Sequence, residues 1–174
     1  MRYCIDLHNH SCLSSCASDD LLPAVLAMEA ADQGIDILAL TDHNTGRNLG
    51  SFKEACEIVE ITPIFGIEIT TNEEIHLLAL FENLDEAQKF SLYIENLLPK
   101  IPNTPKLFGN QIISDLTGEN SEELTVMLSN ACDISFDTLV EEILALGALA
   151  IPAHIDRPSN SVIGNLGFIP PLNY

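Results

Sequence analysis

All five histidines of this chain lie at the beginning or end of short apolar runs. The apolar runs and their histidines are residues 3–7 with His8 and His10, residues 35–40 with His43, residues 75–80 with His76, and residues 148–153 with His154. Short apolar runs between helical patterns predict buried strands. Strand ends are where α/β barrels place their chemistry, and imidazole is a common ligand of zinc, manganese and iron. The placement therefore predicts a metal site at one rim of a sheet.

Strand-like and helix-like patterns alternate over most of the chain. Expected strands cover residues 3–7, 35–40, 63–70, 75–80 and 148–151, and expected helices cover residues 23–33, 48–59, 84–98 and 136–146. This alternation predicts a layered α/β fold with a mostly parallel sheet. Residues 99–134 show no clear period, so we expect a long irregular insertion there, with a short helix near residues 122–128.

Residues 71–74 form a link that is too short for a parallel crossover, which needs a dozen or more residues. The strands at 63–70 and 75–80 are therefore expected to form a hairpin. Alternation along the first of them displays Ile64, Gly66 and Glu68 on one face. The hairpin then brings His76 near Glu68, at the same rim as the other histidines.

Several polar side chains are candidates for this site. His8 and His10 are two residues apart at a strand end, so both point the same way and can hold one ion. Asp42 is either a neighbour of His43 or a second ligand, although an Asp-His pair also caps turns. Glu68 would cost several kcal/mol if it were buried without a partner. We expect it to bridge two cations, with a buried ion pair to an arginine as the alternative.

Two arginines follow the candidate ligands closely. Arg47 lies four residues after His43, and Arg157 lies three residues after His154. Either guanidinium can hold a phosphate with two hydrogen bonds. The alternative is that arginines in so acidic a chain pair with nearby carboxylates. Arg157 is the stronger candidate for a catalytic role, together with Asp42.

The charge of the chain narrows the choice of partners. It contains 7 lysines and arginines against 26 acidic residues, a formal charge of −19. Such a surface repels nucleic acid and anionic lipid unless metal ions locally invert it. We expect a small phosphorylated substrate, with neither duplex nucleic acid nor a membrane as partner. No apolar stretch reaches the roughly 18 residues of a spanning helix.

The five cysteines are an odd number, and no secretory leader is apparent at the N-terminus. Disulfides are therefore not expected, and a reducing cytoplasm is the predicted location. Cys12 and Cys16 could form a soft metal pair, but no second Cys/His pair at zinc-finger spacing accompanies them. A free thiol in a loop is the preferred interpretation.

Together, these motifs resemble the PHP (polymerase and histidinol phosphatase) family of metal-dependent phosphoesterases. The matching segments are residues 6–11, 40–45 and 66–69, His76 before an apolar run, and residues 152–154. The resemblance implies a distorted seven-stranded β/α barrel with two or three divalent ions (Zn, Mn or Fe) at its C-terminal rim. It also implies three ligand sets, namely His8, His10 and Glu68 for one ion; Glu68, His76 and His154 for a second; and His43 with Asp19 or Asp20 for a third.

The chain also departs from that family pattern. PHP domains normally continue to a further strand that ends in an Asp-x-His or Ser-Asp-Ala-His motif, whereas residues 155–174 contain Asp156 but no histidine. We therefore expect residues 1–174 to form a single PHP-like domain whose barrel is truncated at its C-terminal end. An open sheet edge is usually paired or covered. Self-association through that edge, or completion by a longer enzyme, is the expected consequence.

The predicted function is hydrolysis of a small phosphomonoester or a short nucleotide, in which metal-activated hydroxide attacks phosphorus. One alternative is a C–N metallohydrolase of the amidohydrolase kind. That class usually has a bridging carboxylated lysine or glutamate, and the four lysines here lie away from strand ends. The other alternative is a non-catalytic metal-binding or assembly domain.

Overall fold

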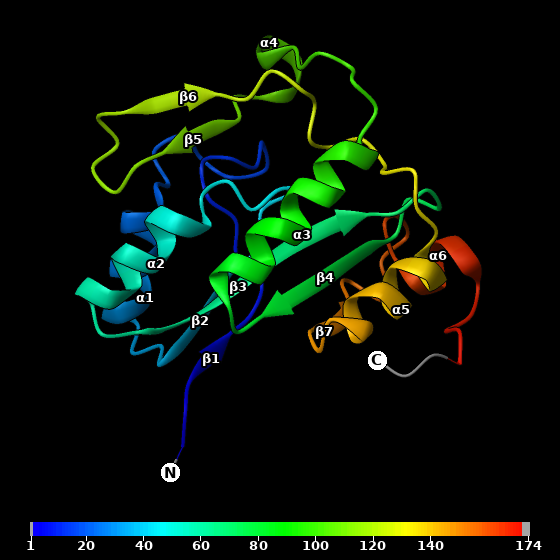
Figure 1. The fold of residues 1–174 in the computed structure, drawn as a ribbon, viewed down its shortest axis with the longest axis horizontal. Helices are drawn as coiled ribbons and strands as arrows, with labels where there is room; N and C mark the ends of the chain where they lie inside the picture. The colour runs from blue at the N-terminus through cyan, green and yellow to red at the C-terminus, as the bar shows by residue number, and fades with distance from the viewer. Residues whose placement is uncertain (1, 172–174) are drawn as a thin grey trace.

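A five-stranded sheet organises the computed structural model, which describes residues 2–171 (Figure 1). Its strands are β1 (Ile5–Asp6), β2 (Ile37–Leu40), β3 (Thr62–Thr70), β4 (His76–Phe81) and β7 (Leu149–Pro152), and they lie side by side in that order. β1, β2 and β3 are parallel, whereas β4 is antiparallel to both β3 and β7. The predicted α/β fold and the hairpin are confirmed. The ends of β1, β2, β3 and β7 therefore share a rim with the beginning of β4.

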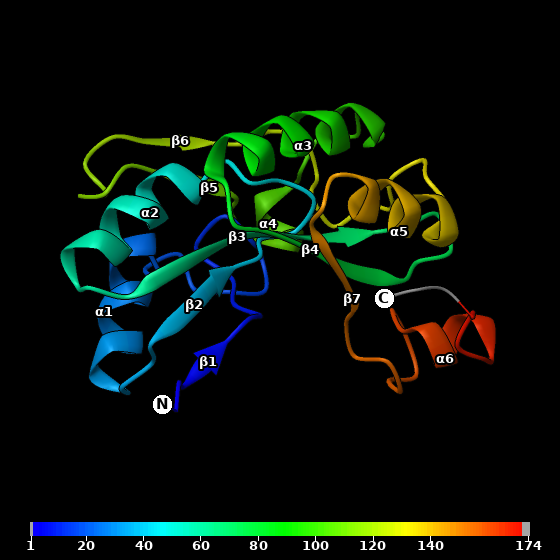
Figure 2. The same cartoon turned by 60° about the horizontal axis from the view of Figure 1, so that its bottom comes forward.

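The helices cover the outer face of this sheet (Figures 1 and 2). They are α1 (Pro23–Asp32), α2 (Leu49–Ile58), α3 (Leu84–Leu97) and α5 (Phe136–Ala145). Local signals set their starts: Pro23 opens α1, and the side chains of Asn83 and Ser135 accept backbone hydrogen bonds at the starts of α3 and α5. The main hydrophobic core lies between these helices and the sheet.

The two faces of β3 contribute to different apolar clusters. Phe65, Ile67 and Ile69 belong to the main core, whereas Ile64 packs with a smaller cluster on the inner face that includes Leu78 and Leu80. This division follows the alternation expected from the sequence. The main core contains most of the buried apolar side chains, so it supplies most of the hydrophobic stabilisation.

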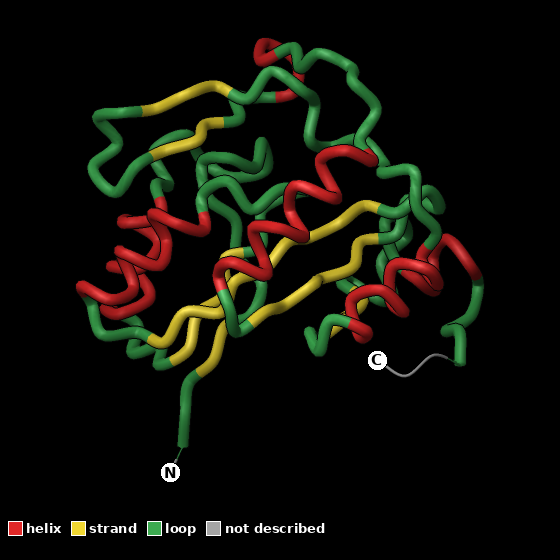
Figure 3. Tube along the Cα trace, in the orientation of Figure 1, coloured by secondary structure: helices red, strands yellow, loops and turns green. Residues whose placement is uncertain are grey.

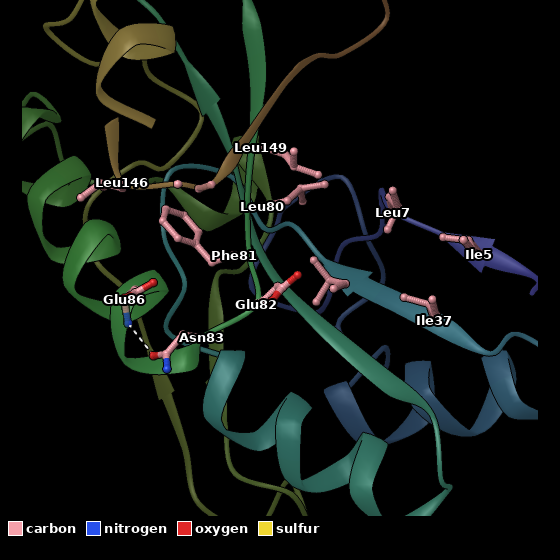
Figure 4. Close-up of a pocket in the computed structure, with 13 residues that line it drawn as sticks. Ile5, Leu7, Ile37, Leu80, Phe81, Glu82, Asn83, Glu86, Leu146 and Leu149 are labelled. Carbon is pink, nitrogen blue, oxygen red and sulfur yellow. Dashed lines mark hydrogen bonds between the residues drawn. The ribbon is translucent and has the colours of Figure 1, made fainter. Parts of the chain in front are cut away.

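An apolar groove of about 480 Å³ lies at the end of the sheet opposite the histidines and extends from the inner face to Glu86 on α3 (Figure 4). Ile5 and Leu149, from the two edge strands, line this groove and expose 51% and 59% of their surface. Within residues 2–171 the sheet is thus an open, curled half-barrel, because β1 and β7 do not pair with each other. Self-association through this edge stays a prediction.

The segment from residue 99 to 134 contains more regular structure than expected (Figure 3). It includes α4 (Pro105–Phe108) and a hairpin of β5 (Ile112–Ser114) and β6 (Ser121–Glu123). The helix predicted near residues 122–128 is wrong. The Asp115 carboxylate accepts backbone hydrogen bonds from Thr117 and Gly118, and this turn returns residues 121–123 to pair with β5.

A last short helix, α6 (Val162–Leu166), follows β7. The Ser161 hydroxyl accepts a hydrogen bond from the Gly164 amide at its start. Among residues 2–171, no helix combines the length and the apolar character that crossing a membrane requires.

Candidate metal centre

The structure brings the five histidines together around the carboxylate of Glu68, which is 1% exposed. The distances to a Glu68 carboxylate oxygen are 3.2 Å from His8 Nε2, 3.0 Å from His10 Nε2, 3.3 Å from His43 Nδ1, 3.0 Å from His76 Nδ1 and 3.0 Å from His154 Nε2. Four segments of the chain thus bring histidines to one buried acid. We call these six residues the rim cluster.

The strand pairing positions the central members of the rim cluster. The Glu68 amide donates to the Asp42 carbonyl at 3.1 Å, and the Asn44 amide donates to the Glu68 carbonyl at 2.9 Å. These bonds continue the β2–β3 ladder past the end of β2 and set His43 directly beside Glu68. His76 opposes Thr70 in the β3–β4 register, two residues from Glu68 on the same face.

His154 adopts a backbone conformation that is uncommon for a residue with a side chain. Its φ angle is +42°, in the left-handed region where residues other than glycine are strained. It directly follows the run that ends β7, and its ring Nε2 lies 3.3 Å from His76 Nδ1. Strain of this kind is typical of functional sites, and here it turns an imidazole toward Glu68.

The rim cluster lines an open pocket of about 520 Å³. Four further residues complete its wall, namely Cys16, Arg157, Ser159 and Asn160. The pocket therefore combines possible metal ligands with one cation and with polar groups, in a space large enough for a small substrate.

The charges in the rim cluster are unbalanced. Hydrogen bonds from His10, His76 and His8 hold the pKa of Glu68 far below its ordinary range, although burial opposes them. Burial alone would lower the pKa of His10, but contacts with Cys16 and Glu68 raise it to about 10. Burial lowers the pKa of His43 to about 3, and repulsion from neighbouring histidines adds to that effect. One carboxylate thus faces five imidazoles, and the largely buried His43 stays neutral among them.

This donor set fits divalent transition ions. His43 Nδ1 is buried and has no hydrogen-bond partner, although it lies 3.3 Å from Glu68 Oε2. His8 and His10 direct their Nε2 atoms at each other across 3.3 Å. Ring nitrogens that converge in this way can ligate metal once they are unprotonated, and imidazole with carboxylate suits zinc, manganese or iron.

Two groups of possible ligands share the Glu68 carboxylate. They are His8, Glu68 and His154, and His43, Glu68 and His76. In each group the possible ligand atoms all lie within 4.8 Å of one another. The shared carboxylate fits the bridging role predicted for Glu68. The partition of the histidines differs from the sets that the family resemblance implies, which pair His8 with His10 and His76 with His154.

Asp42 does not line the pocket, which corrects its expected place among the catalytic residues. It is 1% exposed and accepts hydrogen bonds from the Ser11 amide at 2.8 Å, the Ser11 hydroxyl at 2.6 Å and the Ser14 hydroxyl at 2.7 Å. Burial raises the pKa of Asp42, and the bonds from Ser11 and Ser14 offset part of that rise. The carboxylate therefore acts on the site through its neighbours.

The bond from Ser14 to Asp42 fixes the tautomer of neutral His10. The Ser14 hydroxyl donates its hydrogen to Asp42 and accepts the His43 amide hydrogen. The His10 Nδ1 atom, 3.0 Å from the same oxygen, must then be the donor, because the only hydroxyl hydrogen is already used. In neutral His10 this leaves Nε2 unprotonated and directed at the rim cluster, as metal ligands require.

The acidic ligand expected at Asp19 or Asp20 is not found in the cluster. Both residues are exposed, and the Asp19 carboxylate accepts a hydrogen bond from Asn110 at 2.5 Å. The thiol of Cys16 lies beside the histidines instead, with Sγ 3.5 Å from His43 Nε2. The expectation that Cys16 is merely a free loop thiol is therefore incomplete. The position of Cys16 beside the histidines becomes visible only in the folded loop at residues 11–22.

The two arginines have different environments. Arg47 forms an ion pair with Glu95 on α3, with Nη2 and Oε2 2.7 Å apart, which is the alternative that the sequence left open. Arg157 lines the pocket beside His154. Of the two, only Arg157 is available for a ligand in this pocket.

The chain belongs to the PHP domain family, because the sequence model of that family matches residues 6–153, most of the chain. The sequence is also similar to part of a 5'-3' exoribonuclease from Haemophilus influenzae. The two are 42% identical over 79 residues, which make up 43% of this chain and 27% of the exoribonuclease. The chain thus spans about a quarter of that relative.

Two solved structures show the same fold. One is assigned as a metal-dependent phosphoesterase from Bifidobacterium adolescentis, with a TM-score of 0.61 and 15% identity, covering 90% of this chain and 68% of that one. The other is a lesion-specific endonuclease from Pyrococcus furiosus, with a TM-score of 0.62 and 16% identity, covering 91% of this chain and 36% of that one. At this identity the likeness establishes the fold alone.

Proposed function

We propose that this chain carries the metal centre of a metal-dependent phosphoesterase that hydrolyses a small phosphomonoester or a short nucleotide. The observation that carries the proposal is the position of Glu68, buried at the centre of five imidazoles and open to a pocket at the sheet rim. Membership of the PHP domain family supports the same class of hydrolase.

Each part of the pocket has a role in this proposal. The rim cluster would hold two ions that share Glu68, and Cys16 extends the ligand set. When bound, divalent ions supply an activated water and neutralise phosphate charge. Arg157 donates to the phosphate oxygens from its place beside His154 in the pocket wall. Asp42 and Ser14 hold the Nδ1 hydrogen of His10, so the proton that a bound metal would displace is the one on Nε2.

The charge of the chain supports a small substrate. A formal charge of −19 repels a long polyanion, and site ions neutralise only the phosphate that enters the pocket. The partial relative is a 5'-3' exoribonuclease, so a short oligonucleotide that presents one end fits the proposal. Duplex DNA is not proposed as a substrate.

Removal of metal is expected to abolish hydrolysis of a phenyl phosphate ester, because the chain supplies no other activated nucleophile in the proposal. Activity is measured before chelation, after chelation and after return of zinc or manganese. Recovery with either metal supports the proposal. If the chain binds metal but hydrolyses neither phenyl phosphate nor short oligonucleotides, it is instead a metal-binding or assembly domain. Tight binding of duplex DNA at physiological salt would contradict the assignment of a small substrate.

Replacement of Arg157 with alanine is expected to lower kcat/KM about 10- to 100-fold, because a hydrogen-bonded contact between two charged groups is lost. The bound metal should stay unchanged. Arg47→Ala is the matched control, since Arg47 is paired with Glu95. Equal kinetics for the Arg157 variant and the unaltered chain would remove Arg157 from the phosphate site.

A further inference from the structure

The chain between His154 and α6 forms a short loop at the edge of the pocket. Two residues of this loop, Arg157 and Asn160, line the pocket. The Arg157 amide donates to the His154 carbonyl at 3.0 Å, and the His76 amide donates to the Asn160 carbonyl at 3.2 Å. The loop is thus attached to two members of the rim cluster. We call residues 155–161 the arginine loop.

The side chain of Ser161 fixes the end of the arginine loop. Ser161 is 0% exposed. Its hydroxyl donates to the Arg157 carbonyl at 2.5 Å and accepts a hydrogen bond from the Gly164 amide at 2.9 Å. A hydroxyl has one hydrogen to donate, and here that hydrogen goes to the Arg157 backbone. The same serine therefore begins α6 and holds Arg157.

Gly164 leaves the space that this contact needs. A Cβ atom at position 164 would overlap the Arg157 carbonyl oxygen and would lie 2.7 Å from Ser161 Oγ. Non-bonded carbon contacts are optimal at about 3.5–4.0 Å, so a side chain here would push the arginine loop away from α6. The φ angle of Gly164 is not positive. The close approach of the loop, and not the backbone conformation, is therefore what requires glycine.

The helix α6 is itself anchored to the turn between β3 and β4. Asn165 Nδ2 donates to the carbonyls of Glu73 and Glu74 at 2.8 and 3.2 Å. The two strands joined by this turn carry Glu68 and His76. The hairpin that supplies two possible metal ligands thus also supports the helix that holds Arg157.

The guanidinium of Arg157 has no comparable support. The residue is exposed, and within residues 2–171 no ion pair or side-chain hydrogen bond holds its guanidinium. The position of its backbone therefore decides which part of the pocket the guanidinium can reach. A fixed backbone also reduces the conformational freedom that is lost when a ligand binds.

We propose that Ser161 is a positioning residue for phosphate recognition. By holding the Arg157 carbonyl, it keeps the arginine loop where the guanidinium can meet a phosphate at the rim cluster, and Gly164 admits that carbonyl to the start of α6. The inference rests on the function proposed above, in which Arg157 contacts the phosphate. Ser161 and Gly164 do not line the pocket, so they act on the phosphate only through Arg157.

Double substitution separates this role from simple support of the fold. Ser161→Ala and Gly164→Ala should each weaken the binding of inorganic phosphate to the metal-loaded chain, and lower kcat/KM for phenyl phosphate, by about 10-fold, because a shift of about 1 Å is enough for such a loss. In an Arg157→Ala background the same changes should alter both quantities less than about 2-fold. Calorimetry measures phosphate binding without turnover. Gly164→Ala keeps the Ser161 hydroxyl, so it carries the test if Ser161→Ala does not fold.

Ser135→Ala and Gly50→Ala are the matched controls. Ser135 begins α5 as Ser161 begins α6, with its hydroxyl accepting the Thr138 amide. Gly50 lies within α2, where an added Cβ would meet only the Gln88 side chain, at 3.9 Å. Both controls lie outside the pocket wall, so phosphate affinity and kcat/KM should stay unchanged.

Equal losses with and without Arg157 would show that Ser161 and Gly164 merely support the fold, and would overturn the inference. Loss of metal from Ser161→Ala, or no phosphate binding by the unaltered chain, would also overturn it. The outcome is separable from the proposed reaction. A chain that binds phosphate with the expected dependence on Arg157 but hydrolyses no ester refutes the reaction alone, whereas an active chain without that dependence refutes the inference alone.

Discussion

Glu68→Gln is expected to remove most of the bound metal and to lower phosphoesterase activity by at least about 100-fold. Loss of a residue that only orients a ligand typically costs about 10- to 100-fold, and Glu68 contacts all five histidines directly. Glutamine has nearly the same shape, so the buried position stays filled. Elemental analysis and ester hydrolysis measure the two effects.

The matched control for that variant is Glu82→Gln. Glu82 is exposed and directly follows β4, at the end opposite His76. This change should leave metal content and activity unchanged. Full metal content in Glu68→Gln would mean that the carboxylate does not bridge the ions.

Asp42→Asn is expected to lower the free energy of unfolding by about 2 kcal/mol, because its new amide group is an additional buried donor. The amide nitrogen would face either the Ser11 amide and the Ser14 hydroxyl, or the Ser11 hydroxyl. That hydroxyl already accepts hydrogen bonds from Asn48 and Leu13. Metal affinity should also fall about 10- to 100-fold, since Ser14 no longer fixes His10. Chemical denaturation and metal titration measure the two quantities.

Asp20→Asn serves as the control for Asp42→Asn. Asp20 is exposed and lies outside the ligand groups, so stability and metal affinity should both stay unchanged. Equal metal affinity in Asp42→Asn and in the control would show that the Asp42 and Ser14 contacts do not tune the site.

The strands and the central acid were predictable because local rules decide them. A four-residue link allows only a hairpin between β3 and β4, and alternation along β3 then places Glu68 and His76 on one face. The two apolar sides of β3 follow from the same alternation. Short-range geometry was sufficient for this part of the site.

The ligand at the loop tip was not predictable in the same way. Asp19 and Cys16 are three residues apart, and each has chemistry that suits a metal. Contacts made by the folded chain decide between them. The Asn110 side chain donates a hydrogen bond to the Asp19 carboxylate, and a backbone hydrogen bond from the Cys12 amide to the Leu21 carbonyl closes the loop that contains Cys16. Strand β6 was not predictable for a similar reason. Residues 121–123 become a strand only because a turn brings them beside β5, with which they pair.

The loop that supplies His43 also fastens the segment from residue 99 to 134. Asn44, at φ +54°, donates from Nδ2 to the carbonyls of Leu128 and Asn130 at 2.6 and 2.9 Å. Its Oδ1 accepts the Thr70 amide at 2.9 Å. One side chain therefore joins a strand, a ligand loop and a distant segment.

Asn48 repeats this connection a turn further along the chain. Its Nδ2 donates to the Ile112 carbonyl at 3.1 Å, and its Oδ1 accepts the Ser114 amide at 2.9 Å. The clasp made by Asn44 and Asn48 couples the β5–β6 region mechanically to the ligand loop. Substitutions in residues 111–130 would therefore disturb metal binding from a distance, although no residue there is a ligand in the groups described. A screen for loss of function would then wrongly assign these residues to a second active site.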